Sequence, residues 1–201
     1  SMNFLETPLL ANYLHTAPVV FDEWKEEILC RRGKSYDVIL FPVIDWHFRV
    51  QRPQHLVREL AASGHRAFYL TTTFFESTIP NFKVLESPAE NVFIVQLGCP
   101  TDHPNIYNDT LTEDQQKFLL AGLIKLCTSY KLNAIASIVD LPFWGKVAEA
   151  LPSSVMVYDC MDHHAGFTTN SEAMLSTEEQ VLKESNLVIS TSALLAEKLS
   201  E

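Results

Sequence analysis

Glycine is scarce in this chain, and its scarcity argues against two large classes of nucleotide-binding enzyme. The 201 residues include six glycines, and neither G-x-G-x-x-G nor G-x-x-x-x-G-K-[ST] occurs. Both motifs need closely spaced glycines because backbone N–H groups must approach the phosphate oxygens closely. The sequence therefore argues against a dinucleotide-dependent dehydrogenase and against a P-loop enzyme.

Basic residues are also few. The chain has 15 Lys and Arg against 25 Asp and Glu, a formal net charge of −10 and a sequence pI of about 5.1. Broad binding to nucleic acids or to anionic membranes depends on a positive field. We therefore expect no nucleic-acid partner, although a local basic spot remains compatible with a phosphate or sugar-acid ligand.

Paired cysteine motifs and long apolar runs are absent as well. None of the four cysteines, Cys30, Cys99, Cys127 and Cys160, belongs to a C-x-x-C pair, so we expect reduced, buried thiols. No apolar run approaches the roughly 20 residues that cross a bilayer. The start of the chain, SMNFLETPLL, lacks the basic segment of a secretory signal. These features predict a cytoplasmic protein.

What the chain does contain is an alternation of apolar runs and helical patterns, within an ordinary composition of 47% hydrophobic and 20% charged residues. Apolar runs without polar alternation are typical of strands buried on both faces of a parallel sheet. We therefore predict an α/β fold, a Rossmann-like parallel sheet of about six strands with helices on both faces. The expected strands are 38–43, 67–70, 92–97, 134–139, 155–158 and 187–189.

Helix start signals support this alternation. Thr112 with Gln115, and Thr169 with Glu172, form capping boxes. The expected helices are 53–63, 112–130, 169–184, one from Pro142 that ends before Pro152, and one from Thr191 or Ser192. Residues 82–85 and 92–97 are expected to pair as a hairpin. The predicted organisation is a lead-in of residues 1–36, with a helix at 19–32, followed by one domain of residues 37–201.

The loop after the first expected strand carries an unusual set of side chains. Asp45, Trp46, His47, Arg49, Gln51 and Arg52 lie within eight residues. A loop that only turned the chain would favour Gly, Asn and Ser. In an open parallel sheet, ligands bind beyond the carboxyl ends of the strands, where such loops lie.

Two further loops should reach the same edge of the sheet. One carries Asp140, Phe143 and Trp144; the other begins at Asp159 and includes Asp162, His163, His164 and Phe167. Aromatic walls with a few polar groups are typical of a small-molecule site. The rings of Trp46, Phe143, Trp144 and Phe167 would offer faces for a sugar or a base. A structural alternative stays open: Asp140 and Asp159 as caps of helices or turns, and Arg49 and Arg52 as surface charges.

Four segments, in order and spacing, resemble the amino-terminal half of bacterial GT-B glycosyltransferases, and most closely the nucleotide-sugar transferases of teichuronic-acid and capsule biosynthesis. They are FPVIDWHFRVQRPQHLVREL, LPFWGKVAEAL, VYDCMDHHAGF and SNLVISTSALLAEKL. The resemblance spans roughly residues 36–201, and QRPQ and YDCMD-x-H are its most specific parts. It implies that residues 37–201 form an acceptor-side domain. The donor-binding carboxyl-terminal domain would lie outside this chain, so the fragment alone is expected to be inactive.

The resemblance also implies ligands and roles. The donor of the full-length enzyme would be a nucleotide sugar, with no cofactor or metal in this fragment, and the acceptor a saccharide or a lipid-linked saccharide; it also allows peripheral membrane association. Arg49 or Arg52 would bind a diphosphate or an acidic acceptor. Asp45 or Asp162 would orient the acceptor hydroxyl, or act as its base in an inverting enzyme, and His163 would hydrogen-bond the transferred sugar. Retention or inversion stays open. Trp46, His47, Gln51, Asp140, Phe143, Trp144 and Phe167 complete the expected binding site.

Two other functions remain alternatives. The sequence Asp-His-His at 162–164 follows an expected strand, as in DHH phosphoesterases, which bind manganese. That family also carries D-x-D-G near its first strand, where this chain has DWHF. The second alternative is a non-catalytic Rossmann-like binding module.

Overall fold

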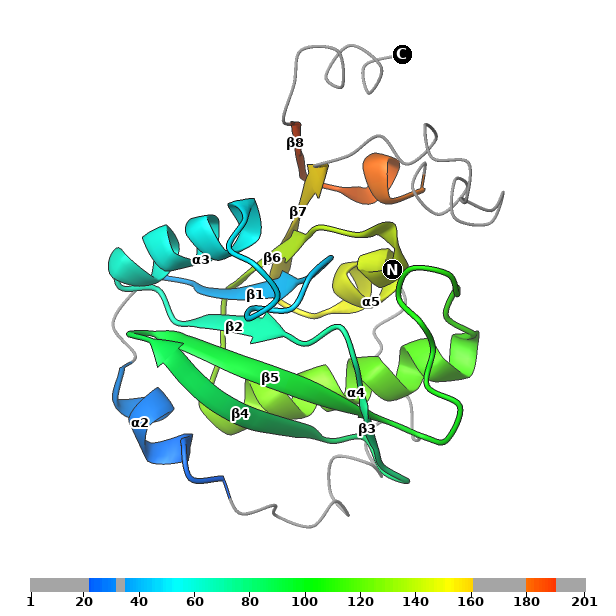
Figure 1. Ribbon diagram of the computed structural model, residues 1–201, viewed down its shortest axis with the longest axis horizontal. Helices are drawn as coiled ribbons and strands as arrows, with labels where there is room; N and C mark the ends of the chain where they lie inside the picture. The colour runs from blue at the N-terminus through cyan, green and yellow to red at the C-terminus, as the bar shows by residue number, and fades with distance from the viewer. Residues whose placement is uncertain (1–21, 32–34, 161–179, 191–201) are drawn as a thin grey trace.

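The molecule is built on one eight-stranded, mostly parallel sheet (Figure 1). The structure, a computed structural model, describes residues 22–31, 35–160 and 180–190. Its strands follow the order β3-β5-β2-β1-β6-β7-β8, and β4 pairs antiparallel with β5. Their bounds are β1 Asp37–Phe41, β2 Ala67–Leu70, β3 Phe75–Glu76, β4 Phe82–Ala89, β5 Val92–Cys99, β6 Ile135–Val139, β7 Ser154–Cys160 and β8 Leu187–Ser190.

The predicted α/β class and its six parallel strands are confirmed, as β1, β2, β5, β6, β7 and β8. The predicted hairpin is confirmed as β4 and β5, with Phe82 opposite Leu97 and Ala89 opposite Val92. The short strand β3 was not predicted. It contributes two residues beside Gly98 and Cys99, too few to leave a periodic pattern in the sequence.

The described helices are α2 Lys25–Cys30, α3 Arg52–Ala62, α4 Glu113–Tyr130, the 3-10 turn η2 Pro142–Trp144, α5 Gly145–Ala150 and a helical segment at 180–184. Helix α3 and helix α4, with the helical turn at Pro142, follow the predicted start signals. Thr112 Oγ1 accepts a hydrogen bond from the Gln115 N–H at 3.2 Å, and Gln115 Oε1 accepts one from the Thr112 N–H at 2.9 Å. This capping box fixes the start of α4. The second predicted capping box, at Thr169 and Glu172, and the last predicted helix lie outside the described residues.

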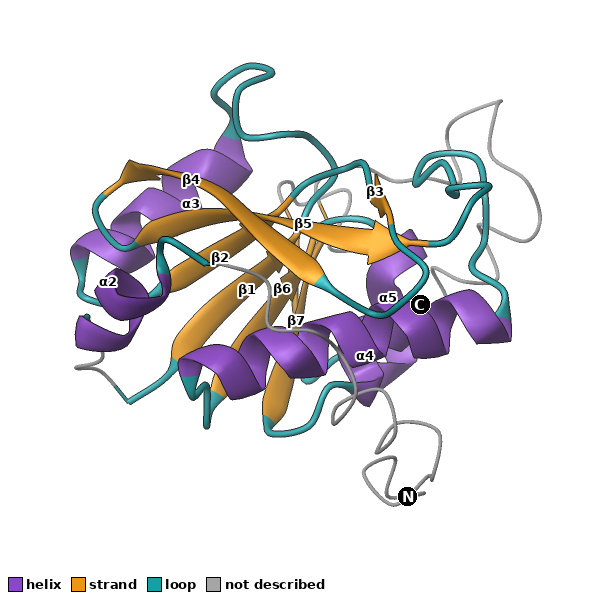
Figure 2. Ribbon diagram, turned by 90° about the horizontal axis from the view of Figure 1, so that it is seen from below, coloured by secondary structure: helices purple, strands orange, loops and turns teal. Residues whose placement is uncertain are grey.

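Helices lie on both faces of the sheet, with α3 on one and α4 on the other (Figure 2). Strand β1 shows why, because successive strand side chains point to opposite faces. Val38 and Leu40 pack with Val57 of α3, whereas Ile39 and Phe41 belong to the larger core that includes α4 and α5. None of the described helices has the length and apolar composition that a bilayer crossing requires.

The lead-in helix is shorter than predicted within the described residues. Helix α2 starts at Lys25, and its residue Ile28 is fully buried in the larger core. Cys30 is exposed, so its predicted burial is wrong. Two residues along a helix correspond to about 200° of rotation, which turns Cys30 away from the side that Ile28 buries. Cys99 is buried and Cys127 partly buried, both as free thiols; the side chain of Cys160 lies outside the description.

A buried arginine joins four elements at the amino-terminal edge of the sheet. Arg66, 1% exposed, donates from Nε and Nη2 to the two carboxylate oxygens of Asp37, each at 2.7 Å. Its Nη1 donates to the carbonyl oxygens of Ile28 at 3.1 Å and Tyr130 at 3.0 Å. The guanidinium therefore connects β1 with α2 and α4 from a position just before β2.

We predict that Arg66→Met destabilises the protein by about 3–5 kcal/mol, because it leaves a partly buried carboxylate and two carbonyl groups without their donor. Urea unfolding followed by circular dichroism measures the change. Arg31→Met is the matched control: Arg31 makes partly exposed ion pairs with Glu27 and Glu90, and an exposed pair contributes about 0.2–1 kcal/mol. Equal effects of the two substitutions would contradict the role given to Arg66.

Candidate functional site

The candidate site lies where β1, β2, β6 and β7 end, at the carboxyl edge of the sheet. Asp45, in the loop after β1, is fixed by Thr72, in the loop after β2. The Thr72 N–H and Oγ1 donate to Asp45 Oδ1 and Oδ2, both at 2.8 Å. Both oxygens of Asp45 therefore already accept a hydrogen bond, and the residue joins two loops of this edge.

Gln54 organises the rest of the loop from its place at the start of α3. Its side chain is fully buried. Nε2 donates to the carbonyl oxygens of Arg49 at 2.8 Å and Trp46 at 3.2 Å, while Oε1 accepts from the Gln51 N–H at 3.0 Å. An amide suits this position because it provides both donors and an acceptor. Gln54 was not among the predicted site residues, although the QRPQ segment that contains it was singled out.

Arg52 extends from this loop to a buried carboxylate at the end of β7. Its Nε donates to Asp159 Oδ2 at 2.9 Å. The side chain of Asp159 is fully buried, whereas that of Arg52 is 41% exposed. The pair is thus anchored in the protein at one end and open to solvent at the other. The structure therefore brings the end of the loop after β1 close to the end of β7, through the contact between Arg52 and Asp159.

A second buried carboxylate lies beside this pair. The backbone N–H of Asp140 donates to the Phe41 carbonyl oxygen at 3.0 Å, which fixes Asp140 beside the end of β1. Its side chain is 2% exposed, and neither carboxylate oxygen has a hydrogen-bond partner among the described residues. Burial raises the pKa of Asp140 well above its usual range; the negative charge of Asp159 raises it further, while Arg52 opposes both.

Two phenols line the same edge. Tyr69 donates from its hydroxyl to the Ile44 carbonyl oxygen at 2.8 Å, and Tyr107 to the Val43 carbonyl oxygen at 2.6 Å. Burial, followed by the charges of Asp140 and Asp45, raises the pKa of Tyr69. Burial and then Asp45 also raise the pKa of Tyr107. Both phenols therefore remain protonated donors that hold the loop after β1.

Three predicted stacking residues lie in the core instead of on an open surface. Trp46 packs edge-on against Tyr69, with ring centroids 5.3 Å apart. Trp144 is fully buried and donates from Nε1 to the Pro42 carbonyl oxygen at 3.0 Å, and Phe143 is 7% exposed against it. Their large apolar area favours burial. The structure therefore offers none of these ring faces to a sugar.

The remaining predicted residues of the loop are more accessible. His47 is exposed and contacts Glu86 of β4. Arg49 is exposed beside the ring of Phe48, with 5.6 Å from the guanidinium carbon to the ring centroid, and Gln51 is half-buried at the amino-terminal cap of α3. Asp162, His163 and Phe167 lie outside the described residues. So does His164, and the DHH segment therefore stays untested.

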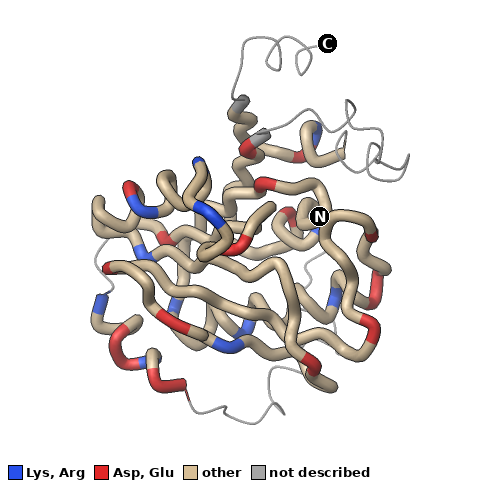
Figure 3. Tube along the Cα trace, in the orientation of Figure 1, with Lys and Arg blue, Asp and Glu red and all other residues tan. Residues whose placement is uncertain are grey.

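The described part of the chain contains no group of three or more His, Cys, Asp and Glu side chains arranged to hold a metal ion. In the coloured part of the trace, charged residues of both signs are interspersed and form no single basic face (Figure 3). The local charge at the carboxyl edge of the sheet, and not a broad surface field, is therefore what a ligand would meet there.

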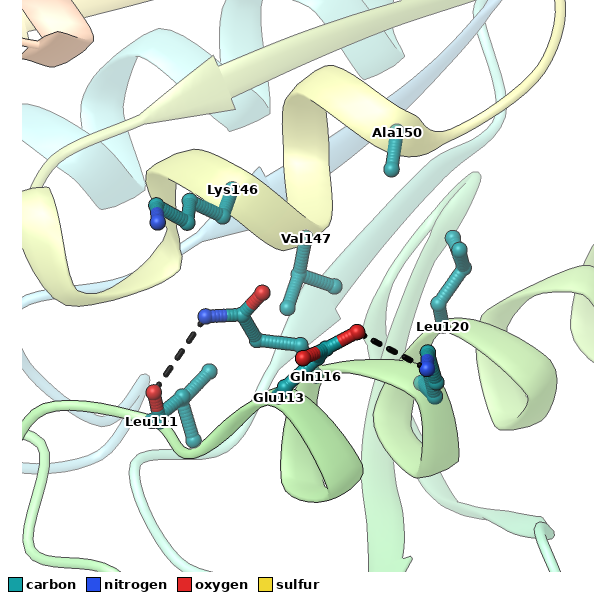
Figure 4. A pocket seen from close by; sticks show the side chains of 8 residues that line it. Leu111, Glu113, Gln116, Leu120, Lys146, Val147 and Ala150 are labelled. Carbon is teal, nitrogen blue, oxygen red and sulfur yellow. Dashed lines mark hydrogen bonds and ion pairs between the residues drawn. The ribbon is translucent and has the colours of Figure 1, made fainter. Parts of the chain in front are cut away.

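A hollow of about 440 Å³ lies between the start of α4 and α5 (Figure 4). Glu113 and Lys117 on its wall pair with each other at 2.9 Å, and Gln116 donates to the Leu111 carbonyl oxygen at 3.2 Å. These groups already satisfy one another. The hollow is therefore a weaker candidate for a ligand site than the carboxyl edge of the sheet, where Asp140 has no hydrogen-bond partner among the described residues.

No protein-family model and no curated protein sequence matches the chain. Its function has to be argued from the residues and their geometry.

We predict that Asp140→Asn changes how stability depends on pH. A carboxyl group whose folded-state pKa is raised contributes stability that is complete below its ordinary pKa of 3.8 and is lost as pH rises through the raised value. As pH rises within that window, the free energy of unfolding of the wild type should fall, relative to that of the variant, by up to about 1.4 kcal/mol per pH unit. Urea unfolding at a series of pH values measures this. If the difference in free energy of unfolding between the two proteins stayed constant across the pH series, the raised pKa of Asp140 would be contradicted.

A second prediction concerns Gln54. Gln54→Glu keeps the shape of the side chain but removes the donors to Arg49 and Trp46. We expect a loss of about 1–3 kcal/mol and faster amide hydrogen exchange confined to residues 45–52. Gln116→Glu, which removes one similar donor beside α4, is the matched control and should leave that loop protected. Unchanged exchange in the Gln54 variant would show that the loop holds its shape without this amide.

Proposed function

We propose that this chain is the acceptor-side domain of a GT-B glycosyltransferase, which moves a sugar from a nucleotide-sugar donor to a saccharide or lipid-linked acceptor during cell-surface polysaccharide synthesis. Two independent features support the proposal. The fold is a Rossmann-like sheet whose carboxyl edge carries polar groups, the usual position for ligands in this architecture. The four sequence segments that resemble such transferases include the loop from Asp45 to Arg52 and the end of β7.

The observation that carries the proposal is the hydrogen bonding of the Arg52 guanidinium. Its Nε is held by the buried Asp159, while its terminal nitrogens make no hydrogen bond to the described residues. A guanidinium held along one edge presents a fixed fork of N–H donors, which suits a phosphate or carboxylate group. Arg52 is therefore the residue we assign to an anionic group of the acceptor or of the donor.

The other residues would support this contact. Asp45 and Gln54 fix the loop so that Arg52 meets the ligand in one orientation, which lowers the entropic cost of binding. Asp45 keeps spare acceptor capacity because each of its oxygens has a second lone pair, and it could accept a hydrogen bond from an acceptor hydroxyl. Asp162 as a base and His163 as a sugar ligand remain parts of the proposal. The protein would act in the cytoplasm, where nucleotide sugars are available, with peripheral attachment to the membrane.

Saccharide binding tests this function. Saturation-transfer NMR should detect acidic saccharides on the purified chain, with at most weak signals from nucleotide sugars. Arg52→Gln should weaken binding about 10–100-fold, the equivalent of losing charge-assisted hydrogen bonds of about 1.5–3 kcal/mol. Arg31→Gln, at the carboxyl-terminal cap of α2, is the matched control and should bind as the wild type does.

Two outcomes would contradict the proposal. One is that neither this chain nor a longer product of its reading frame binds any saccharide or nucleotide sugar, and that the longer product transfers no sugar. The other is a strong manganese-dependent rise in melting temperature that disappears in His163→Ala, which would favour the DHH phosphoesterase.

A further inference from the structure

The carboxyl edge of the sheet carries more buried negative charge than its one arginine balances. Asp159 is fully buried and Asp140 is 2% exposed, while Arg52 is the only cation whose contacts reach either of them among the described residues. With both carboxyl groups ionised, the cluster of Arg52, Asp140 and Asp159 carries a net charge of −1. Such a cluster would repel the anionic group that Arg52 is otherwise built to bind.

Hydrogen bonding distinguishes the two carboxyl groups. Asp159 Oδ2 accepts a hydrogen bond from Arg52 Nε at 2.9 Å, so this carboxyl group has a cationic partner. Asp140 accepts nothing on either oxygen, and an isolated buried carboxylate is costly unless it takes up a proton. Asp140 is therefore the member of the cluster that holds a proton most readily.

Within the described ranges, the surroundings of Asp140 supply no other compensating charge. Asp159 faces it from β7 and Arg52 from α3; Tyr69 on β2 is a neutral phenol that interacts with both Asp140 and Asp45. Strand β1 contributes Phe41, whose carbonyl oxygen accepts from the Asp140 backbone N–H. The charge of the cluster thus depends on one proton at Asp140.

We propose that Arg52 binds the phosphate or carboxylate group of its ligand together with one proton, which is held on Asp140. This inference rests on the proposed function for the position of the ligand. No covalent bond changes: at a pH where Asp140 of the free protein is ionised, a proton moves from solvent to an Asp140 oxygen on binding, and the net charge of the cluster rises from −1 to 0. By linkage, the bound anion favours protonation of Asp140 as much as that protonation favours the anion.

The expected pH dependence of anion affinity follows from this coupling. Affinity for an anion of constant charge should be highest when Asp140 is protonated and should fall as pH rises, by up to tenfold per pH unit for one coupled proton. Asp140→Asn carries no titrating group, so it should bind with nearly constant affinity, above that of the wild type at alkaline pH. Asp159→Asn should weaken binding at every pH because Arg52 loses its anchor.

Two probes of constant charge separate the sources of the anionic group: inorganic sulfate stands in for a phosphate, and glucuronate supplies a sugar carboxylate. NMR titrations of the purified chain, read at the Arg52 Nε–H resonance from about pH 5.5 to about pH 8.5, give the affinities. Calorimetry in buffers of different ionisation enthalpy counts the protons taken up and needs no variant. Asp114→Asn, an exposed position on α4, is the matched control.

A fall in wild-type affinity with rising pH, proton uptake on binding, and a flat profile in Asp140→Asn would support the inference. A flat wild-type profile, or a slope that survives in Asp140→Asn, would overturn it. Binding of neutral saccharides without any response to sulfate or glucuronate would also overturn it, while leaving the acceptor-domain function in place. Arg52→Gln should abolish the binding of sulfate and glucuronate. Binding that persisted in this variant would show that the anion binds away from Arg52, and would overturn the inference.

Discussion

The rest of the structure depends on the ion pair between Arg66 and Asp37. It holds the amino-terminal ends of β1 and β2 together and connects them to the carbonyl groups of Ile28 and Tyr130. Burying a charged pair is costly unless nearly every donor and acceptor is satisfied, and here two carboxylate oxygens and two carbonyl groups satisfy the guanidinium. The arrangement fixes the register in which Val38 lies opposite Ala67. Because the strands start in register, the loops at their other ends emerge side by side.

That register is what allows the candidate site to form. Asp45 and Thr72 follow neighbouring strands and meet through two short hydrogen bonds; a shift of one residue would turn alternate side chains to the other face. Gln54 then fixes the loop from within α3, and Arg52 reaches across to β7. The two ends of the sheet thus use buried charge differently. The amino-terminal end satisfies every group around Arg66, whereas the carboxyl end leaves part of its arginine exposed and one carboxyl group without a partner.

The fold was largely predictable because its signals are local. Apolar runs marked the parallel strands, and the capping box of Thr112 marked the start of α4. The candidate site was less predictable because its contacts are distant in sequence: Arg52 meets Asp159 across 107 residues. The polar loop after β1 was recognised as special, but its side chains could not be sorted from composition. Trp46 and Trp144 have the same ring as a sugar-binding tryptophan, and only tertiary packing shows that the core encloses them.

In the function proposed for this chain, Asp140 is where stability and function oppose each other most clearly. A core position at the end of β6 would be more stable with an uncharged side chain, since an unpaired buried carboxylate is destabilising. Local departures from the most stable choice concentrate at functional sites, where the rest of the fold compensates for them. The satisfied network around Arg66 and the apolar layers on both faces of the sheet provide that compensation. In the function proposed for this chain, the carboxyl edge would keep a proton-holding group beside an exposed guanidinium, and a ligand would meet a site of adjustable charge and fixed geometry.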